Sequence, residues 1–134
     1  MSDHKKAIVR KLIEEVQVGG NYAVFDALMH PKFIDHTPTP GFSPDRDSVR
    51  AFYRAFHASF SEPVCEIDFQ TAEGDLVTTR KVYSVTHSGP FNGIPPTGRR
   101  ITFDVIDVLK VEGEFITAHW GILNLMKIVA QISW

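Results

Sequence analysis

Two residues that could carry acid–base chemistry lie inside segments that otherwise read as apolar strands. Asp107 stands in Ile106-Asp107-Val108-Leu109, and His119 stands in Thr117-Ala118-His119-Trp120. On a strand, Asp107 shares its face with apolar residues only: Ile101, Phe103, Val105 and Leu109. Because a buried ionisable group is costly without a partner, we expect these two side chains to lie in a pocket. A carboxylate beside an imidazole can move protons near neutral pH, so a small-molecule site is the leading hypothesis.

The hairpin between these two strands decides whether Asp107 and His119 share a face. A three-residue loop at Glu112–Glu114 pairs Asp107 with His119, whereas a two-residue loop pairs Asp107 with Ala118 and puts the histidine behind the sheet. Gly113 suits the positive φ that a three-residue loop requires, so we expect that loop. A purely structural histidine stays open as an alternative.

The charge state of Asp107 depends on its neighbours. Burial would raise the pKa of this carboxyl group, and a nearby cation would lower it. Arg80 interrupts an apolar face of the preceding strand, so we expect Arg80 to be that cation. Two interpretations remain open: a buried Arg80–Asp107 ion pair that only joins two strands, and a carboxylate that acts on a substrate. Asp104 lies on the opposite face and is expected to be solvated or at an interface.

Further candidate binding residues surround the Asp107–His119 pair. They are aromatic or polar residues expected at the wall or mouth of a cavity: Tyr53, Phe56, Trp120, Asn124, His36 and His87. For His87 the alternative is a structural anchor for the Gly89–Gly98 loop, and for Trp120 it is core packing. The histidines are far apart and lack the spacing of metal ligands, so no metal site is predicted.

Composition favours one globular domain over residues 1–134. The chain has 43% apolar residues, 22% charged residues and a net charge of −2. It has no basic stripe, no run long enough to span a bilayer and no secretory h-region, so neither nucleic acid nor a membrane is an expected partner, and the cytoplasm is the expected location. A single cysteine, Cys65, allows no internal disulfide and is expected to be a buried thiol.

Helical patterns come first and strand patterns follow. Apolar residues at helical spacing predict a first helix around residues 9–16, Asn21 can cap a second, and a third is expected to begin near residues 45–48. Alternating or apolar runs predict strands at 64–71, 76–87, 100–111 and 115–123, before a short helix at 125–132. This order predicts an α+β fold in which a curved antiparallel sheet wraps around the N-terminal helices. The resulting cone would open between the sheet and the aromatic face of the third helix.

Several motifs, in their order, resemble one family over nearly the whole chain. They are Ala7-Ile8-Val9-Arg10, Gly19-Gly20-Asn21, His30 to Thr37, Thr86-His87-Ser88-Gly89, Gly93 to Arg100 and His119-Trp120-Gly121. The chain resembles the SnoaL-like polyketide cyclase or ester cyclase group of the NTF2-like superfamily. The resemblance implies a cone-shaped α+β barrel, a homodimer, and no metal or organic cofactor. It also implies ring closure by intramolecular aldol condensation on a small, mostly apolar carbonyl compound, with cyclic and aromatic substrates among the candidates.

One departure from the family affects the site. In the antibiotic cyclases, the proton-abstracting aspartate lies two residues after the strand histidine, a position that holds Gly121 here. The position of their other histidine, on the preceding strand, holds Asp107. The leading hypothesis is therefore a rearranged site with Asp107 as general base and His119 as proton shuttle or hydrogen-bond donor. The alternatives are a ketosteroid-isomerase-like isomerase or a hydratase, a non-catalytic ligand-binding module, and a dimeric scaffold with a filled cone.

Overall fold

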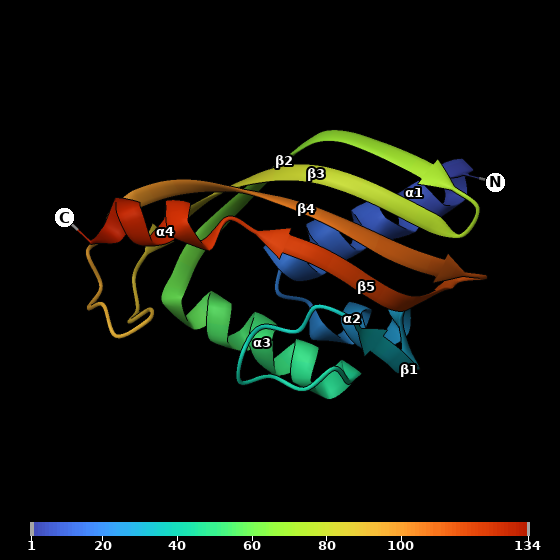
Figure 1. The fold of residues 1–134 in the computed structure, drawn as a ribbon, viewed down its shortest axis with the longest axis horizontal. Helices are drawn as coiled ribbons and strands as arrows, with labels where there is room; N and C mark the ends of the chain where they lie inside the picture. The colour runs from blue at the N-terminus through green and yellow to red at the C-terminus, as the bar shows by residue number, and fades with distance from the viewer. Residues whose placement is uncertain (1, 134) are drawn as a thin grey trace.

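The computed structural model describes residues 2–133 (Figure 1). In chain order the elements are α1 (Ser2–Lys11), η1 (Leu12–Val18), α2 (Tyr22–Leu28), β1 (Met29–Asp35), α3 (Arg46–Ser59), β2 (Phe60–Glu73), β3 (Leu76–His87), β4 (Arg100–Glu112), β5 (Phe115–Leu123) and α4 (Leu125–Ile132). Asn21 caps α2 with its side chain, as predicted, and α3 begins where expected, with Asp45 as its cap. None of the described helices is long and apolar enough to cross a membrane.

The described strands form one curved sheet in the order β1-β5-β4-β3-β2. Neighbouring strands run antiparallel, except that β1 runs parallel to β5. In Figure 1, α1, α2 and α3 lie along one side of this sheet, while α4 lies at the far end of β4 and β5. The predicted α+β class, with a sheet wrapped around the N-terminal helices, is confirmed.

The predicted apolar stripe of the first helix is buried, but it spans two elements, α1 and η1. Val9, Leu12, Ile13 and Val16 are at most 1% exposed and pack in a cluster with residues of the sheet. From Leu12 to Val18 the chain continues as a π-helix, η1. This geometry is rare in proteins overall, and where it occurs it is often near a functional site. Gln17 lies near the end of η1, beneath the sheet.

The hairpin between β4 and β5 differs from the prediction. Glu112 pairs with Phe115, so the loop is the two residues Gly113 and Glu114 rather than three. A β-bulge follows, because Val111 pairs with Ile116 while Lys110 pairs with Ala118, which leaves Thr117 as the extra residue. Asp107 is therefore opposite Gly121, and the predicted Asp107–His119 pairing is wrong.

The same bulge nevertheless puts Asp107 and His119 on one face. His119 pairs with Leu109, which shares the face of Asp107, so both side chains point to the inside of the curved sheet. Without the extra residue at Thr117, the short loop would have turned the histidine outward.

The face of β3 that points inward is not the face that includes Arg80, as was expected, but the opposite one. Val77, Thr79, Lys81, Tyr83, Val85 and His87 are buried, while the face that includes Arg80 is only partly covered. Arg80 binds Asp68, with 2.8 Å between Nη1 and Oδ2, and lies 4.0 Å from Asp104 on the outside of the sheet. The expected Arg80–Asp107 contact is therefore wrong.

Candidate functional site

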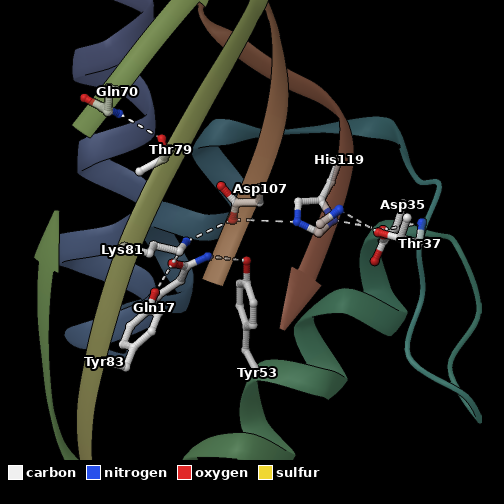
Figure 2. Close-up of polar contacts among 11 residues, drawn as sticks. Gln17, Asp35, Thr37, Tyr53, Gln70, Thr79, Lys81, Tyr83, Asp107 and His119 are labelled. Carbon is white, nitrogen blue, oxygen red and sulfur yellow. Dashed lines mark hydrogen bonds and ion pairs between the residues drawn. The ribbon is translucent and has the colours of Figure 1, made fainter. Parts of the chain in front are cut away.

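A continuous row of charged side chains crosses the inner face of the sheet (Figure 2). Lys81 of β3 donates from Nζ to Oδ2 of Asp107 on β4, at 2.9 Å. Nε2 of His119 on β5 lies 3.7 Å from the same carboxylate oxygen. On its other side, Nδ1 of His119 is 2.9 Å from Oδ1 of Asp35, at the end of β1. The imidazole is therefore held between two carboxylates that come from different strands.

Gln17 closes the buried end of this row. Its Oε1 atom accepts hydrogen bonds from Nζ of Lys81, at 2.8 Å, and from the hydroxyl of Tyr83. Its Nε2 atom donates to the hydroxyl of Tyr53 on α3, at 2.9 Å. One amide side chain thus joins η1 to both the sheet and α3, which fixes the position of the Lys81 ammonium group.

Burial and charge pairing set the charge of Asp107. The side chains of Asp107 and Lys81 are 3% and 2% exposed. Burial alone would raise the pKa of Asp107, but the Lys81 ammonium and His119 outweigh it and lower the pKa to about 2. Asp107 is therefore ionised at every physiological pH, and its Oδ1 atom is buried without a hydrogen-bond partner.

The opposite shift occurs at His119. Burial would lower the pKa of the imidazole, but contacts with Asp107 and Asp35 raise it to about 9. His119 is thus an imidazolium at neutral pH. Its side chain keeps 27% of its surface exposed, against 13% for Asp35 and 3% for Asp107, so His119 is the member of the row that solvent reaches best.

Apart from His87, four of the predicted site residues point into the interior. Asp107 and His119 lie in the row, Tyr53 contacts it through Gln17, and Phe56 packs among Phe60, Phe91 and Phe103. Around the row, the inward-facing Val105, Gly121 and Leu123 of the sheet are only partly buried, as are Phe52 and Phe56 of α3. The interior face beside His119 is therefore apolar and incompletely covered.

Three other predicted binding residues lie outside. His36 stacks on Trp120 with ring centroids 4.6 Å apart, and both side chains are on the outer face of the sheet. Asn124 caps α4 and bonds Asp104, also on the outside. Their predicted place at an inner cavity is wrong, because Trp120 lies after the bulge, where the even-numbered positions of β5 point away from Asp107, and His36 stacks on its ring.

His87 is inside, but far from the row. It is fully buried, and its Nδ1 accepts a hydrogen bond from the backbone N–H of Thr97, at 3.2 Å. The hydroxyl of Thr97 is 3.0 Å from the same nitrogen. These contacts hold the loop between β3 and β4, which favours the anchoring role over a place at a pocket mouth.

Two surface hollows lie on the outer face. One, of about 700 Å³, includes Asp104, Ile106, Trp120 and Ile122, and the other, of about 560 Å³, includes His30, Lys32, His36 and Lys110. Neither is lined by Asp107 or His119. Within residues 2–133, no three His, Cys, Asp or Glu side chains are gathered as metal ligands.

The sequence analysis did not identify two members of the row, Lys81 and Asp35, or two residues that support it, Gln17 and Tyr83. A signal existed for Lys81, because Val77, Tyr83 and Val85 form a stronger apolar face than the one that includes Arg80. Gln17 and Asp35 carried no such signal, since their contacts join residues 64 and 84 positions apart.

The sequence matches the family model of SnoaL-like polyketide cyclase over residues 7–132. The chain belongs to the SnoaL-like polyketide cyclase family. Among proteins of curated function, none matches it significantly in sequence.

Solved structures agree with this family and with the NTF2-like cone fold. IdmH from Streptomyces antibioticus, described as a candidate polyketide cyclase, is 26% identical with a TM-score of 0.85 over 97% of this chain and 99% of its own. TsrD from Streptomyces laurentii is also 26% identical, with a TM-score of 0.81 over 94% of this chain and 95% of its own. AclR from Streptomyces galilaeus, described as a candidate hydroxylase, is 17% identical and shows the fold alone, with a TM-score of 0.87 over 99% of this chain and 83% of its own.

In this member of the SnoaL-like family, the charged groups on the inner face of the sheet include Asp107 and His119, and Gly121 lies opposite Asp107. The structure places the carboxylate of Asp107 and the imidazole of His119 on the inner face of the sheet. The fold alone does not decide the reaction, because one fold supports many reactions.

Proposed function

We propose that this SnoaL-like protein is an acid–base enzyme that closes a ring in a small, mostly apolar carbonyl compound without a cofactor. The observation that carries the proposal is the imidazole of His119, which is partly exposed on an apolar inner face and held between two carboxylates. A charged donor in a poorly solvated place stabilises a developing enolate or alkoxide oxygen far better than water does.

His119 is the proposed proton donor. Its Nε2 atom is 3.7 Å from Asp107, beyond hydrogen-bond length, so its proton is available to a substrate carbonyl oxygen. As the ring-closing C–C bond forms, that proton moves from Nε2 to the oxygen that becomes the hydroxyl group. Nδ1 keeps its bond to Asp35, which holds the orientation of the ring.

Asp107 is the proposed acceptor of the carbon-bound proton. Its Oδ1 atom has no partner, so it has a free lone pair. A carboxylate with a pKa of about 2 is a weak base. Its pKa is held low by the charges of Lys81 and His119, so when His119 gives up its proton the pKa of Asp107 rises and the carboxylate becomes a stronger base. The acid and base steps therefore assist each other, and the proton then returns from Asp107 to Nε2 of His119.

The expected product is an isomer of the substrate, or that isomer after loss of one water. We suggest mass spectrometry on a panel of linear and aromatic 1,3-dicarbonyl compounds, with a β,γ-unsaturated ketosteroid included. A shifted double bond without ring closure would favour the isomerase. Ligands that bind but are never converted would favour the non-catalytic binding module instead.

Replacing His119 with glutamine is expected to reduce kcat by about 100- to 10,000-fold, because it removes the general acid but keeps a polar side chain. The matched control is His36→Gln, since His36 lies on the outer face and should not affect turnover. The measurement is kcat on a converted member of the panel. Equal activity of His119→Gln and wild type would rule out the proposed role.

We also propose that the protein is a homodimer joined through the outer face of the sheet. Ile106, Ile122 and Met126 are 47%, 78% and 85% exposed there, beside the apolar hollow of about 700 Å³. An exposed apolar patch of this kind marks an interaction surface. The family's dimeric habit supports the same conclusion, and the cytoplasm remains the proposed location.

Replacing Ile122 with lysine is expected to convert the dimer to a monomer, since it would place a charge at the centre of an apolar contact. Analytical ultracentrifugation measures the change. Glu62→Lys is a control, because Glu62 is exposed away from the patch. A wild-type protein that sediments as a monomer at high concentration would contradict the proposal.

A further inference from the structure

Gly121 lies opposite Asp107 and two residues after His119, at the centre of the charged row. A Cβ atom built on Gly121 would lie 2.7 Å from Nε2 and 2.8 Å from Cε1 of His119, and 3.1 Å from Cβ of Asp107. Real side chains do not approach so closely. The space that any side chain at position 121 would need is therefore filled by the imidazole ring.

The backbone of Gly121 does not explain this glycine. Gly20, Gly74 and Gly113 have positive φ angles, which favour glycine, but Gly121 is in a strand and is not among such residues. A glycine in a strand often marks the close approach of another group. Here that group is the ring of His119.

We propose that Gly121 is a positioning residue, whose missing side chain lets the imidazole of His119 lie over β5 and face Asp107. Any effect of Gly121 on turnover rests on the proposed function of His119. The placement of the ring can be tested without any substrate.

The surroundings decide which group would move if a methyl group were added. Asp107 is buried and held by Lys81, so it cannot withdraw. His119 is tethered at Nδ1 by Asp35 but is partly exposed, so its ring would rotate away from Asp107. The backbone N–H of Gly121 donates to Oγ1 of Thr37, at 2.8 Å, and this bond holds the strand itself in place. A side chain at position 121 and the present position of the imidazole therefore exclude each other.

The test is Gly121→Ala, with Ile122→Ala as the control on the next residue, whose side chain points outward. NMR of ¹³C-labelled histidine would follow the titration of His119, assigned with His119→Gln. The charged groups that face the ring are Asp107 and Asp35, with Lys81 behind Asp107. Wild type and Ile122→Ala should titrate near the pKa of about 9, and Gly121→Ala at least one pH unit lower. An unchanged titration in folded Gly121→Ala would overturn the proposal.

A second measurement covers the case in which Gly121→Ala fails to fold. In a His119→Ala background the ring is absent, so adding Gly121→Ala should leave the denaturation midpoint nearly unchanged. If Gly121→Ala lowers the midpoint equally in both backgrounds, or unfolds both, the ring is not the obstacle and the proposal is wrong. A lowered titration with unchanged turnover would instead support the positioning role and contradict the proposed function of His119.

Discussion

Replacing Lys81 with methionine is expected to destabilise the fold by about 3–5 kcal/mol at neutral pH, the usual effect of removing one partner from a buried ion pair. Lys81 and Asp107 are almost fully buried, and Nζ is the only hydrogen-bond donor that contacts Asp107 among the described residues. Methionine keeps most of the volume but leaves the carboxylate with only the more distant His119. Urea unfolding at pH 7 would measure the loss.

Two comparisons separate the charge effect from simple loss of packing. Arg80→Met changes the neighbouring cation on the outer face, whose nearer partner, Asp68, is exposed, and should cost about 1 kcal/mol or less. The double variant Lys81→Met with Asp107→Leu removes both charges and should recover most of the stability. If Lys81→Met lowers the unfolding free energy no more than Arg80→Met does, the buried Lys81–Asp107 pair does not stabilise the fold as expected.

The sequence of β3 predicted a cation beside Asp107 but indicated the wrong residue, Arg80 instead of Lys81. Two adjacent cations necessarily point to opposite faces, so one of them had to be inside if either face was buried. Choosing the face required counting the apolar residues on each, and Leu76 and Val82 on the Arg80 face obscured the answer. Only the pairing of β3 with β2 and β4 decides it.

The hairpin is a second case in which the local signal was incomplete. Gly113 does adopt a positive φ, of 61°, which the sequence predicted correctly. Its presence does not reveal a bulge four residues later at Thr117, because a bulge depends on how the whole strand packs. Asp107 and His119 share a face as proposed, but through a short loop and a bulge rather than through a longer loop.

Local features were predicted well because their causes are local. The buried stripe of α1 and η1, the Asn21 cap and the last helix each depend on residues within a few positions. The supports of the site are not local. Asp35 reaches His119 only because β1 pairs with β5 across 84 residues of sequence, and Gln17 reaches Lys81 only because η1 lies under the sheet.

The charged row should also give the protein a stability that depends on pH in two directions. The folded pKa of His119, about 9, is above the ordinary value of 6.5, so its contribution is fully present below pH 6.5 and is lost as the pH rises through 9. The folded pKa of Asp107, about 2, is below the ordinary value of 3.8, so its contribution is present above pH 3.8 and is lost as the pH falls through 2. Stability from this row should therefore be greatest between pH 4 and 6.5.

His119→Gln isolates the alkaline side of this dependence. Through His119, the unfolding free energy of the wild-type protein should fall by at most roughly 3 kcal/mol between pH 6.5 and 9.5. The fall should be smaller than this limit because solvent screens the exposed edge of the ring. The variant lacks the titrating ring, so its unfolding free energy should fall much less over the same range. Chemical denaturation at several pH values measures both curves, and the two proteins differ only at residue 119. Parallel curves would mean that His119 is not held as an imidazolium, and the proton donor that the proposed reaction requires would then be missing at neutral pH.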